Sequence, residues 1–470
     1  MNRLILNNIS NLLIVCVCVF AVSAYAIEKD NYRGLLPEAN PYPSTYVIPL
    51  SPATALVNGT ILTGTGSRID SGTVLMEAGK IIAVGTNVRL PEGVKVIDAS
   101  GKWITPGIVD PHSHIGVFSS PRVPALNDLN EKTSPNTANV WVEHSVWPQA
   151  PGFERAREAG VTSVMILPGS SNLIGGRTVT LKNVAATTVQ GMKFPGAPYG
   201  VKMSCGENPA KVYGSKGRSP MTRMGVIAEF RAIWLEAAIY AKSWSEYRAK
   251  VANGTQVSPP KRNLKLDTLA LVLNGNFKTH IHCYRADEMQ QMIDLSKEFG
   301  FPIAVFHHAQ EAYKIADVLE KENIGVATWS TRWGFKLEMY DGIEDNVALL
   351  ESAGVLTALH SDAPELSQRM HVEAAVAMAS AIRSGISITR QQAIRWITAN
   401  PATQMGIIDR TGTLEPGKMA DVVMWSGDPF SVYSLAQKVF IDGVLQFDRE
   451  NRQLLPDSDL ELGQLIKETP

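Results

Sequence analysis

The sequence predicts an α/β protein: a (β/α)8 TIM-like barrel with a small β-sandwich domain built from both termini. Between residues 104 and 406, apolar runs typical of strands alternate with runs typical of helices, which is the rhythm of βα units. Eight strand-like runs are present, the number that a closed parallel barrel needs. Two further stretches of alternating apolar runs, at 55–85 and 421–446, flank this middle region and predict the second domain.

Length and composition limit the class of protein. The 470 residues are 45% hydrophobic and 19% charged, so the chain can bury a sizeable core and is not disordered as a whole. There are 44 Lys and Arg against 45 Asp and Glu, a net charge of -1 that argues against a nucleic-acid partner. The balance fits an enzyme that acts on a small-molecule substrate.

Residues 1–26 have the pattern of a signal peptide. Arg3 precedes an apolar run from Leu12 to Val22, and Ala24-Tyr25-Ala26 puts small residues where a signal peptidase reads them. The run is short for a membrane span, and a short N-terminal anchor helix is the alternative. We therefore expect an exported, periplasmic bacterial protein that is cleaved near Ala26 and has no stable membrane span.

The rest of the chain divides into three predicted stretches. Residues 27–103 hold a Pro-rich arm and the first part of the β-sandwich. Residues 104–408 form the barrel, with a helical insertion at 221–263 that we expect over one barrel mouth. Residues 409–470 complete the β-sandwich and end in a solvated tail.

Each candidate barrel strand is a short apolar run bounded by turn residues or by a helical pattern. In chain order these runs are Ile108–Asp110, Thr162–Leu167, Thr178–Leu181, Gly200–Ser204, Thr279–Cys283, Ile303–Phe306, Gly325–Thr328 and Val355–Ala358. The carboxyl ends of the strands carry the active site in such barrels. Residues at or just after these runs are therefore the candidates for chemistry.

Two cysteines, Cys205 and Cys283, remain after the leader, which holds the other two. That number excludes a scaffold held together by several disulfides. The two could pair if they lie on neighbouring strands, but we expect two buried thiols.

Five of the nine histidines lie at or just after predicted strand ends. His112 and His114 are two residues apart on an extended segment, so both imidazoles face the same side. At the fifth, sixth and eighth strands the corresponding residues are His282, the His307-His308 pair and Asp362. Imidazoles together with a carboxylate are ligands that Zn²⁺ prefers, and they predict a metal site at the barrel mouth.

Five motifs resemble those of the amidohydrolase superfamily. They are Ile104-Thr-Pro-Gly-Ile-Val-Asp-Pro-His-Ser-His, Arg285-Ala-Asp-Glu, His360-Ser-Asp-Ala-Pro, Thr398-Ala-Asn-Pro-Ala and Gly412-Thr-Leu-Glu-Pro-Gly-Lys-Met-Ala-Asp. The resemblance covers almost all of the chain after the leader and is greatest to the imidazolonepropionase-related group. It implies a metal-dependent hydrolase with ligands from the first, fourth, fifth and sixth strands and an aspartate at the eighth. Because the superfamily is commonly oligomeric, it also suggests a homo-oligomer.

By this resemblance, His112 and His114 are the ligands from the first strand and Asp362 is the aspartate. At the fifth strand, His282 is preferred to His280 because it lies nearer the catalytic mouth. His280 is then expected to be a buried residue beneath the ligands.

At the sixth strand, His307 and His308 point to opposite sides of a regular strand, so only one of them is expected to serve as a ligand. The following Ala-Gln-Glu-Ala-Tyr stretch matches the spacing of the superfamily when His308 is chosen. His308 is therefore the preferred ligand.

The fourth-strand ligand has two candidates. Lys202 lies within the strand, where a buried cation is costly, and carboxylation would relieve that cost and allow it to bridge two metals. Glu207 could bridge directly, or it could cap the helix that follows. Lys202 is preferred. The expected cofactor is one or two divalent ions, zinc first, with iron, manganese or cobalt as alternatives.

The expected chemistry is hydrolysis by activated water. A bound divalent ion lowers the pKa of its water from about 15.7 toward about 7 and polarises the scissile carbonyl. Asp362 would accept a proton from the attacking water and hand it to the leaving nitrogen. Its structural alternative is a helix N-cap before Pro364.

Three further residues are candidates for binding the substrate. Arg177 and Arg223 can hold a carboxylate through bidentate hydrogen bonds, although solvation at the surface is the alternative for each. Tyr284, just past the fifth strand, can donate to an oxyanion or simply pack.

The sequence thus predicts an exported metal-dependent hydrolase of a C–N bond in an amide, cyclic amide, dipeptide or N-acyl amino acid. The same scaffold supports ester and phosphoester hydrolysis, which is the alternative chemistry. A catalytically inactive periplasmic barrel with a binding or structural role is the alternative class. The presence of candidate residues at the first, fifth, sixth and eighth strands argues against it.

Overall fold

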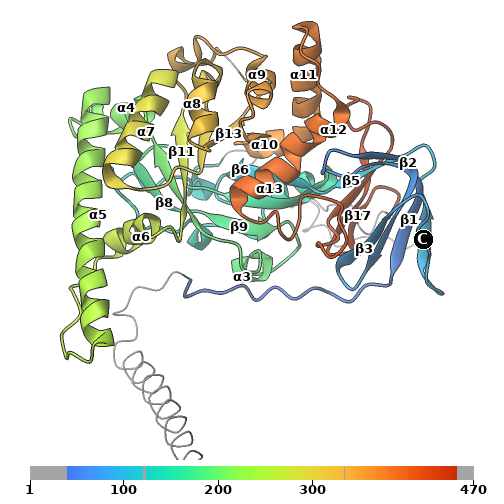
Figure 1. The fold of residues 1–470 in the computed structure, drawn as a ribbon, viewed down its shortest axis with the longest axis horizontal. Helices are drawn as coiled ribbons and strands as arrows, with labels where there is room; N and C mark the ends of the chain where they lie inside the picture. The colour runs from blue at the N-terminus through green and yellow to red at the C-terminus, as the bar shows by residue number, and fades with distance from the viewer. Residues whose placement is uncertain (1–39, 120–122, 333, 452–470) are drawn as a thin grey trace, which may run out of the picture.

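The computed structural model describes residues 40–119, 123–332 and 334–451. The predicted signal peptide and almost all of the predicted C-terminal tail lie outside this part of the chain. Within it, no helix combines the length and the apolar character needed to cross a membrane. The described chain is a mixed α/β structure with a central α/β body and a separate β-sheet at one end (Figure 1).

A six-stranded sheet forms the larger part of the central body, in the order β14-β13-β12-β11-β10-β8. Five of its strands are parallel: β10 (Gly200–Ser204), β11 (Lys278–Cys283), β12 (Val305–His308), β13 (Gly325–Thr328) and β14 (Thr357–Leu359). They correspond to the predicted fourth to eighth strands. Almost all of their residues are buried, as expected of parallel strands that are covered on both faces.

The third predicted strand runs against its neighbours, which an all-parallel barrel does not allow. In the structure it is β9 (Val179–Lys182), antiparallel to β7 (Val161–Ile166). Only Thr178 separates it from β8 (Ile174–Arg177), which is antiparallel to β10. Strand direction depends on how the preceding loop turns the chain, and a run of apolar residues carries no information about it.

The smaller central sheet has the order β6-β7-β9, and β6 (Ile108–Ser113) is parallel to β7. Its outer edge lies beside the end of β14, because the backbone N–H of Asp362 donates to His112 O at 2.8 Å. The side chain of Asp110 adds two hydrogen bonds from Ser361. Among the described residues, strand pairing therefore gives two adjacent central sheets and no single closed ladder.

Helices cover the outside of the central strands (Figure 1). After the strands of the larger sheet come α7 (Ala286–Phe299), α8 (Ala316–Lys321), α9 (Asn346–Ser352) and α11 (Met370–Arg383). Apart from α5, the remaining α-helices of the described chain are α2 (Pro151–Glu158), α3 (Val189–Met192), α4 (Glu207–Gly214), α6 (Leu264–Leu273), α10 (Pro364–Ser367), α12 (Arg390–Ala393) and α13 (Ala399–Met405). The ends of α7 follow from its sequence, since acidic residues occupy its first turn and Gly300 closes it with a φ of +75°.

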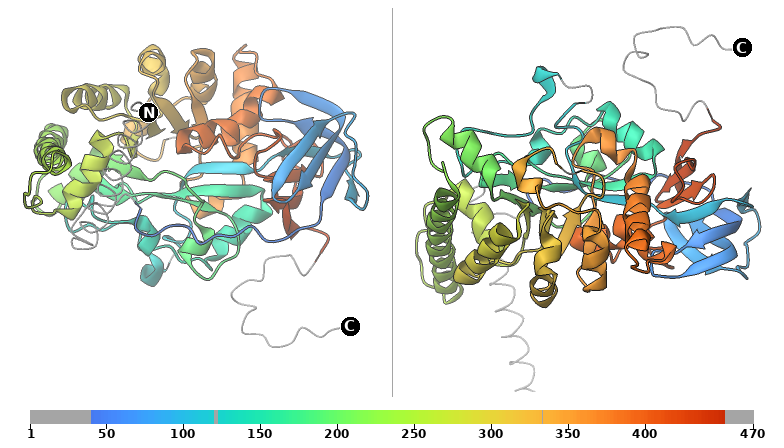
Figure 2. Two further views of the ribbon diagram at one scale, coloured as in Figure 1. Left: turned by 60° about the horizontal axis from the view of Figure 1, so that its bottom comes forward. Right: turned by 90° about the horizontal axis from the view of Figure 1, so that it is seen from above.

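The predicted helical insertion is α5 (Arg223–Ala252), but it does not lie over the mouth. Its apolar face packs against α6 and α7, and Trp234 stacks on Phe301 with ring centroids 4.2 Å apart. This places α5 along the side of the central body, at the end of the molecule opposite the separate sheet (Figures 1 and 2). The apolar face of α5 packs on neighbouring helices, and the pattern of apolar residues in the sequence does not tell which elements those are.

The separate sheet combines strands from both ends of the described chain, in the order β17-β16-β15-β5-β1-β2-β3, with β4 pairing with β1. Its first part comprises β1 (Thr54–Leu62), β2 (Arg68–Glu77), β3 (Lys80–Gly85), β4 (Lys95–Asp98) and β5 (Trp103–Pro106). The second part comprises β15 (Val422–Trp425), β16 (Ala436–Ile441) and β17 (Val444–Asp448). The two parts meet where β5 runs antiparallel to β15, and their apolar residues share one core.

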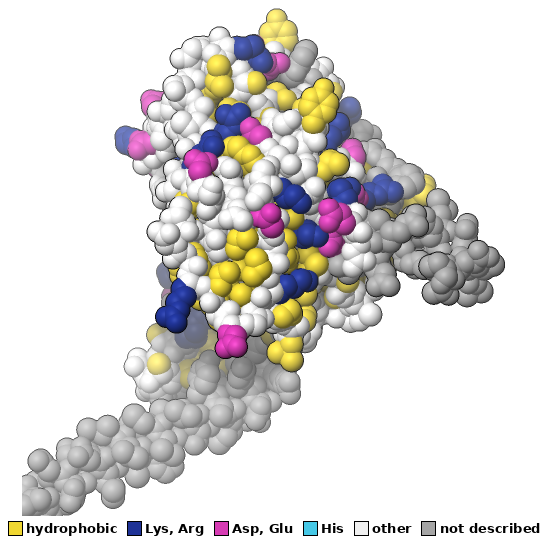
Figure 3. Space-filling view, turned by 90° about the vertical axis from the view of Figure 1, so that its right-hand side faces the viewer, with side chains coloured by type: hydrophobic (Ala, Val, Ile, Leu, Met, Phe, Trp, Pro, Cys, Tyr) yellow, Lys and Arg dark blue, Asp and Glu magenta, His cyan; other side chains and the backbone are white. Residues whose placement is uncertain are grey.

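A buried ion pair connects this sheet to the central body. Lys182 Nζ, at the end of β9, lies 2.7 Å from Asp442 Oδ2 in the turn between β16 and β17. Tyr46 of the extended N-terminal segment donates to the same carboxylate. Figure 3 views the molecule from the side of this sheet, where basic and acidic side chains are interspersed among apolar ones. Among the described residues seen on that face, basic side chains form no continuous surface.

The two cysteines form a disulfide, so the expectation of two free thiols was wrong. Cys205 and Cys283 directly follow Ser204 and His282, which are paired in the parallel register of β10 and β11. Their Cα atoms are 5.3 Å apart, which is within the range that a disulfide spans. The deciding fact is the strand register, which the sequence does not contain.

Candidate functional site

Seven of the nine histidines meet in one cluster at or near the carboxyl ends of the central strands. They come from β6 and the residue just after it, from β11 and β12, and from the segment after β14, and are His112, His114, His280, His282, His307, His308 and His360. All seven are buried, with at most 6% of any one exposed. Because the ends of parallel strands meet at one edge, side chains far apart in the sequence converge there.

The lower part of the cluster is a chain of imidazoles. His280 Nδ1 lies 2.9 Å from His307 Nε2, and His307 Nδ1 lies 3.0 Å from His112 Nδ1. Gly200 makes room for this layer, because a Cβ at that position would come within 2.6 Å of the His280 ring. His280 thus occupies a buried position below the mouth and connects β11 to β6 through His307.

The upper part joins two histidines to Asp362. His112 Nε2 and His114 Nε2 are 3.3 Å apart, and Asp362 Oδ1 is 3.4 Å from each of them. The hydrogen bond from His114 Nδ1 to Leu167 O fixes the orientation of that ring. Asp362 has a φ of +61°, a left-handed conformation that is costly for a non-glycine residue and is often retained at functional sites. These three side chains present their donor atoms to one point.

Both histidines at the end of β12 join the cluster, so the expectation that they point to opposite sides was wrong. The ring centroids of His307 and His308 lie 4.6 Å and 4.9 Å from that of His112. His308 has a φ of +70°, which breaks the alternation of a regular strand and turns its ring back toward the others. His308 also lines the pocket above the cluster, whereas His307 lies beneath it.

His360 is a member of the cluster to which the sequence analysis assigned no role. Its ring stacks on that of His112 at 4.7 Å, and candidate ligand atoms of His112, His308 and His360 lie within 4.8 Å of one another. The signal that would have identified it was present, because His360 comes directly after the eighth strand, at the carboxyl end where His282 and Asp362 were also placed.

Unsatisfied ring nitrogens show that a metal fits this cluster. Within the described residues, six ring nitrogens of the cluster are buried without a hydrogen-bond partner: both of His282, both of His360, Nδ1 of His308 and Nε2 of His280. Buried polar atoms are nearly always paired, so this number of unpaired nitrogens at one place calls for a ligand. Imidazoles beside a carboxylate are a donor set that suits zinc and related divalent ions.

Lys202 reaches this cluster from β10. Its side chain is fully buried, with Nζ 3.2 Å from His112 Nε2 and 3.3 Å from Pro168 O. Burial lowers the pKa of Lys202 to about 7, because removing an ammonium from water penalises its charged form. A substantial share of this amine is therefore neutral near pH 7, the form that can be carboxylated.

Glu207 lies outside the cluster. It is the first residue of α4, and its carboxylate faces Lys336 at 3.5 Å, with about a third of the side chain exposed. Its backbone N–H donates to Glu338 Oε1 at 2.6 Å. The other candidate for the fourth-strand ligand, Lys202, is the one that the structure brings next to His112.

Burial sets the protonation of the cluster. It lowers the pKa of His280 and of His360 to about 3, and it holds the pKa of His308 well below its ordinary value. At neutral pH these imidazoles are therefore neutral, as metal binding requires. Desolvation alone would raise the pKa of Asp362, but the hydrogen bond and attraction from His114 prevail and lower it to about 2. Asp362 is thus a carboxylate.

Asp110 supports the site from below. Its carboxylate accepts hydrogen bonds from the backbone N–H groups of His112 and Ser361 and from the Ser361 hydroxyl. It thereby ties the histidine pair of β6 to the segment that carries Asp362. Burial raises the pKa of Asp110 to about 7 despite these hydrogen bonds.

A pocket of about 470 Å³ opens above the cluster. Its floor includes His114, His282, His308 and Asp362, and Lys336 is among the residues of its rim. Tyr284 forms part of the wall, with its ring stacked on His308 at 5.1 Å. Burial raises the pKa of the Tyr284 hydroxyl well above its ordinary value, so the group stays protonated.

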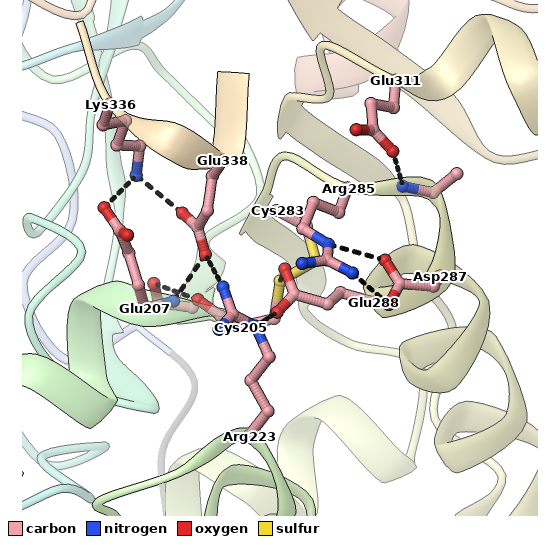
Figure 4. Close-up of a disulfide and its surroundings, with 12 residues drawn as sticks. Cys205, Glu207, Arg223, Cys283, Arg285, Asp287, Glu288, Glu311, Lys336 and Glu338 are labelled. Atoms are coloured by element: carbon pink, nitrogen blue, oxygen red, sulfur yellow. Dashed lines mark hydrogen bonds and ion pairs between the residues drawn. A yellow bond between two sulfur atoms is a disulfide. The ribbon is translucent and has the colours of Figure 1, made fainter. Parts of the chain in front are cut away.

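The two arginines proposed for substrate binding are not among the pocket residues. Arg177 pairs with Val201 at the start of β10, away from its carboxyl end, and lies 3.8 Å from the centre of the Trp141 ring. It is buried there and donates to Thr268 Oγ1. Arg223, at the start of α5, forms ion pairs with Glu288 and Glu338 beside the disulfide (Figure 4).

Comparison with known proteins gives the family. Residues 331–445 match the model of the Amidohydrolase family. A crystal structure of an amidohydrolase from Thermotoga maritima MSB8 matches with a TM-score of 0.77 and 35% identity, over 84% of this chain and 100% of that one. The curated Imidazolonepropionase of Caulobacter vibrioides is 22% identical over 384 residues, which are 76% of this chain and 88% of that protein.

Amidohydrolase tasK of Hapsidospora irregularis is 31% identical over 397 residues, which are 80% of this chain. The match spans only 40% of that longer protein. The relatives agree with the resemblance carried by the strand-end motifs. Because the Thermotoga protein is matched over its whole length at 35% identity, this chain belongs to the amidohydrolase superfamily.

Proposed function

We propose that this protein is an exported, metal-dependent amidohydrolase that hydrolyses the C–N bond of a small amide, cyclic amide or peptide-like compound. The observation that carries the proposal is the convergence of buried, unpartnered imidazole nitrogens and one carboxylate at the floor of a pocket. The relatives named deaminase, imidazolonepropionase and dihydroorotase support C–N chemistry.

The residues that would hold the metal are His112, His114, His282, His308 and Asp362, and Lys202 would join them in carboxylated form. His360 joins them, because its two ring nitrogens are buried beside the same atoms. We prefer Lys202 to Glu207, whose carboxylate is turned toward Lys336. Zinc is the first choice, with iron, manganese or cobalt as alternatives, and such an ion supplies an activated water and polarises a carbonyl.

The residues of the chain itself have three tasks in this proposal. Asp362 takes a proton from the attacking water and gives it to the leaving nitrogen, since its carboxylate lies at the pocket floor. Tyr284, protonated and in the pocket wall, donates a hydrogen bond to the oxygen on which negative charge develops. Asp110 holds the segments that carry His112 and Asp362 in register.

The same proposal includes the architecture and the location. We propose that the central strands form a barrel of the amidohydrolase type, with β8 and β9 as one bent strand that links the two sheets across Thr178. We also propose export through the leader at residues 1–26, and self-association. N-terminal sequencing of the protein from periplasmic extract tests the export, and light scattering of the purified protein tests the self-association.

Metal analysis tests the centre. The protein is purified from metal-rich buffer, and its metal content per chain is compared with that of a His112→Ala/His114→Ala variant. We expect at least one equivalent of divalent metal in the parent and a large loss in the variant. Less than about half an equivalent in the parent would contradict the proposal and favour the inactive barrel.

A substrate screen tests the reaction. The metal-loaded protein is incubated with N-acyl amino acids, dipeptides and small lactams, and with aryl and phosphate esters as the competing classes. We expect hydrolysis in the C–N group. Turnover confined to the esters would show that the scaffold performs the alternative chemistry.

A further inference from the structure

We propose that Lys336 is the binding point for an anionic group of the substrate. The protein would then act on C–N compounds that carry a carboxylate a few atoms away from the scissile bond. For the bond that is cleaved, this inference rests on the proposed hydrolase function. The binding that it describes is a property of the pocket alone and is measured separately.

Lys336 lies at a suitable distance from the reaction site. Its Nζ is 3.8 Å from the centre of the Tyr284 ring, and that ring stacks in turn on His308. The ammonium and the His308 imidazole at the floor of the pocket thus both contact the Tyr284 ring. Both Lys336 and His308 line the same pocket. A compound placed with its C–N bond at the floor can therefore reach the ammonium with a group on its other side.

The position of the ammonium is fixed by two neighbours. Lys336 Nζ donates to Glu338 Oε2 at 2.8 Å and to Asn208 Oδ1 at 3.3 Å. Glu338 is itself buried and accepts hydrogen bonds from Arg223 and from the backbone N–H of Glu207. Figure 4 shows this arrangement, with Lys336 held between the carboxylates of Glu207 and Glu338. A charge that is already in place binds its partner without the entropy cost of ordering a flexible side chain.

The third N–H group of the Lys336 ammonium faces the carboxylate of Glu207, which a substrate can displace. An ammonium has three donors, and Glu338 and Asn208 engage two of them. The remaining neighbour is Glu207, whose Oε1 lies at the longer distance of 3.5 Å and whose side chain is one-third exposed. A partly exposed ion pair of this length contributes little to stability, so a substrate carboxylate can displace Glu207 and make a shorter contact.

The charge of the pocket favours an anion. Besides Lys336, its lining includes Lys132, Lys211 and Arg332, and its acidic residues are Asp362 and Glu365. A concave surface lined mainly by one sign of charge concentrates ligands of the opposite sign.

Arg332 also lies beside an aromatic ring, as Lys336 does. Its guanidinium carbon lies 5.7 Å from the centre of the Trp329 ring, and that ring stacks on His308 at 4.4 Å. Two cations thus lie beside aromatic rings that contact the same candidate metal ligand. Arg332 faces Glu365 at 3.6 Å. Lys336 is the stronger candidate because two hydrogen bonds hold its ammonium in place.

The experiment compares each compound with its carboxamide. N-acetyl-L-leucine, glycyl-L-leucine and L-pyroglutamate are tested beside N-acetyl-L-leucinamide, glycyl-L-leucinamide and L-pyroglutamamide. The metal-loaded holoenzyme is assayed for kcat/KM, and binding of the same pairs is measured by calorimetry. We expect the parent to prefer the free acid of its best pair by about 10-fold to 100-fold, the range of one charge-assisted hydrogen bond.

Lys336→Met should remove this preference. We expect its kcat/KM for the free acid to fall about 10-fold to 100-fold, chiefly through KM, while the value for the amide changes less than about threefold. Lys297→Met is the matched control, because Lys297 also pairs with a glutamate at 2.7 Å but lies on the surface outside the pocket lining. It should behave as the parent does.

Two further variants separate binding from misfolding. Lys336→Arg keeps the charge and should recover most of the preference for the free acid. Glu207→Gln removes the competing carboxylate and should strengthen binding of the free acid, which a purely structural role for Lys336 would not produce. Metal content and thermal melting are recorded for every variant.

The outcomes distinguish the two proposals. If no compound is hydrolysed but the free acids bind in a manner that depends on Lys336, the pocket inference stands and the proposed reaction fails. If compounds are hydrolysed and the parent does not prefer the free acids, or Lys336→Met keeps that preference, the inference about Lys336 is overturned. If Lys336→Met loses its metal or fails to fold, the results for Lys336→Arg and Glu207→Gln decide whether the inference about Lys336 holds.

Discussion

Asp362 is held in place by contacts on three sides. Its carboxylate touches His112 and His114, its backbone N–H donates to His112 O, and its left-handed φ turns the side chain toward the pocket. The hydrogen bonds of the neighbouring Ser361 to Asp110 hold the segment from below. At the scale of single residues, the most informative change is therefore one that keeps this geometry and removes only the charge.

Asp362→Asn should abolish turnover and leave metal content near normal. The amide is nearly isosteric with the carboxylate, but it cannot accept a proton, so we expect kcat to fall by about 10²-fold to 10⁴-fold. Steady-state kinetics and elemental analysis of the same preparation check both parts. Unchanged activity would refute the role assigned to Asp362, and loss of the metal would show that its main task is ligation.

The Cys205–Cys283 disulfide acts at the scale of elements. It joins the ends of β10 and β11 directly beside Ser204 and His282, and it closes a covalent loop with a sequence separation of 78 residues. Glu288 and Arg223 pack around it, so the bridge also fixes the surroundings of the loop that begins α4 (Figure 4). Closing a loop of this length reduces the entropy of the unfolded chain.

Replacing both cysteines by serine should lower the free energy of unfolding by about 2–4 kcal/mol. Urea unfolding of the oxidised parent and of the double variant measures the difference. The parent treated with a reductant serves as the control and should match the variant. Equal midpoints for all three proteins would mean that the bridge does not form or contributes nothing.

The separate sheet shows a second effect at the scale of elements. Strands from the two ends of the described chain meet at β5 and β15, and Trp425 Nε1 donates to Thr105 Oγ1 across that pair at 2.9 Å. The Lys182–Asp442 ion pair then ties the sheet to β9. Because contacts between distant segments carry this junction, its formation depends on the rest of the fold.

Acid sensitivity is a property of the whole molecule. His371 is buried against Trp425, away from the metal centre, and its Nδ1 has no hydrogen-bond partner among the described residues. Burial lowers the pKa of His371 to about 4, against an ordinary value of 6.5 that applies to the unfolded chain. Below pH 6.5 the unfolded state therefore binds a proton that the folded state refuses. The contribution of the neutral His371 side chain to the free energy of unfolding is therefore complete above about pH 6.5 and is lost as the pH falls toward 4.

His371→Gln should make the protein less sensitive to acid. Between pH 7 and pH 4.5 the free energy of unfolding of the variant is expected to fall by about 2 kcal/mol less than that of the parent. This figure follows from the pKa difference of His371 between the folded and unfolded states. Urea unfolding at a series of pH values measures this. The control is His144→Gln, at an exposed histidine beside Trp141, which should leave the pH dependence of the parent unchanged. Parallel curves for His371→Gln and the parent would contradict the assignment.

The local features of this protein could be predicted from its amino-acid sequence. Apolar runs and turn residues placed all eight predicted strands close to their positions in the structure. They also predicted the helical insertion at 221–263, which contains α5. The same patterns placed His112, His114, His282 and Asp362 at strand ends. Spacing of two residues on an extended segment was enough to put His112 and His114 on one side, because that geometry is set within the segment itself.

Features that depend on strand register, strand direction or long-range neighbours could not be predicted from the sequence. The direction of β9, the pairing of Cys205 with Cys283 and the entry of both His307 and His308 into one cluster belong to this group. The contact of Lys336 with the Tyr284 ring also belongs to this group. Each follows from a strand register, one left-handed φ or a contact between loops far apart in the chain, and these are set by the packing of the whole molecule rather than by any local run of residues.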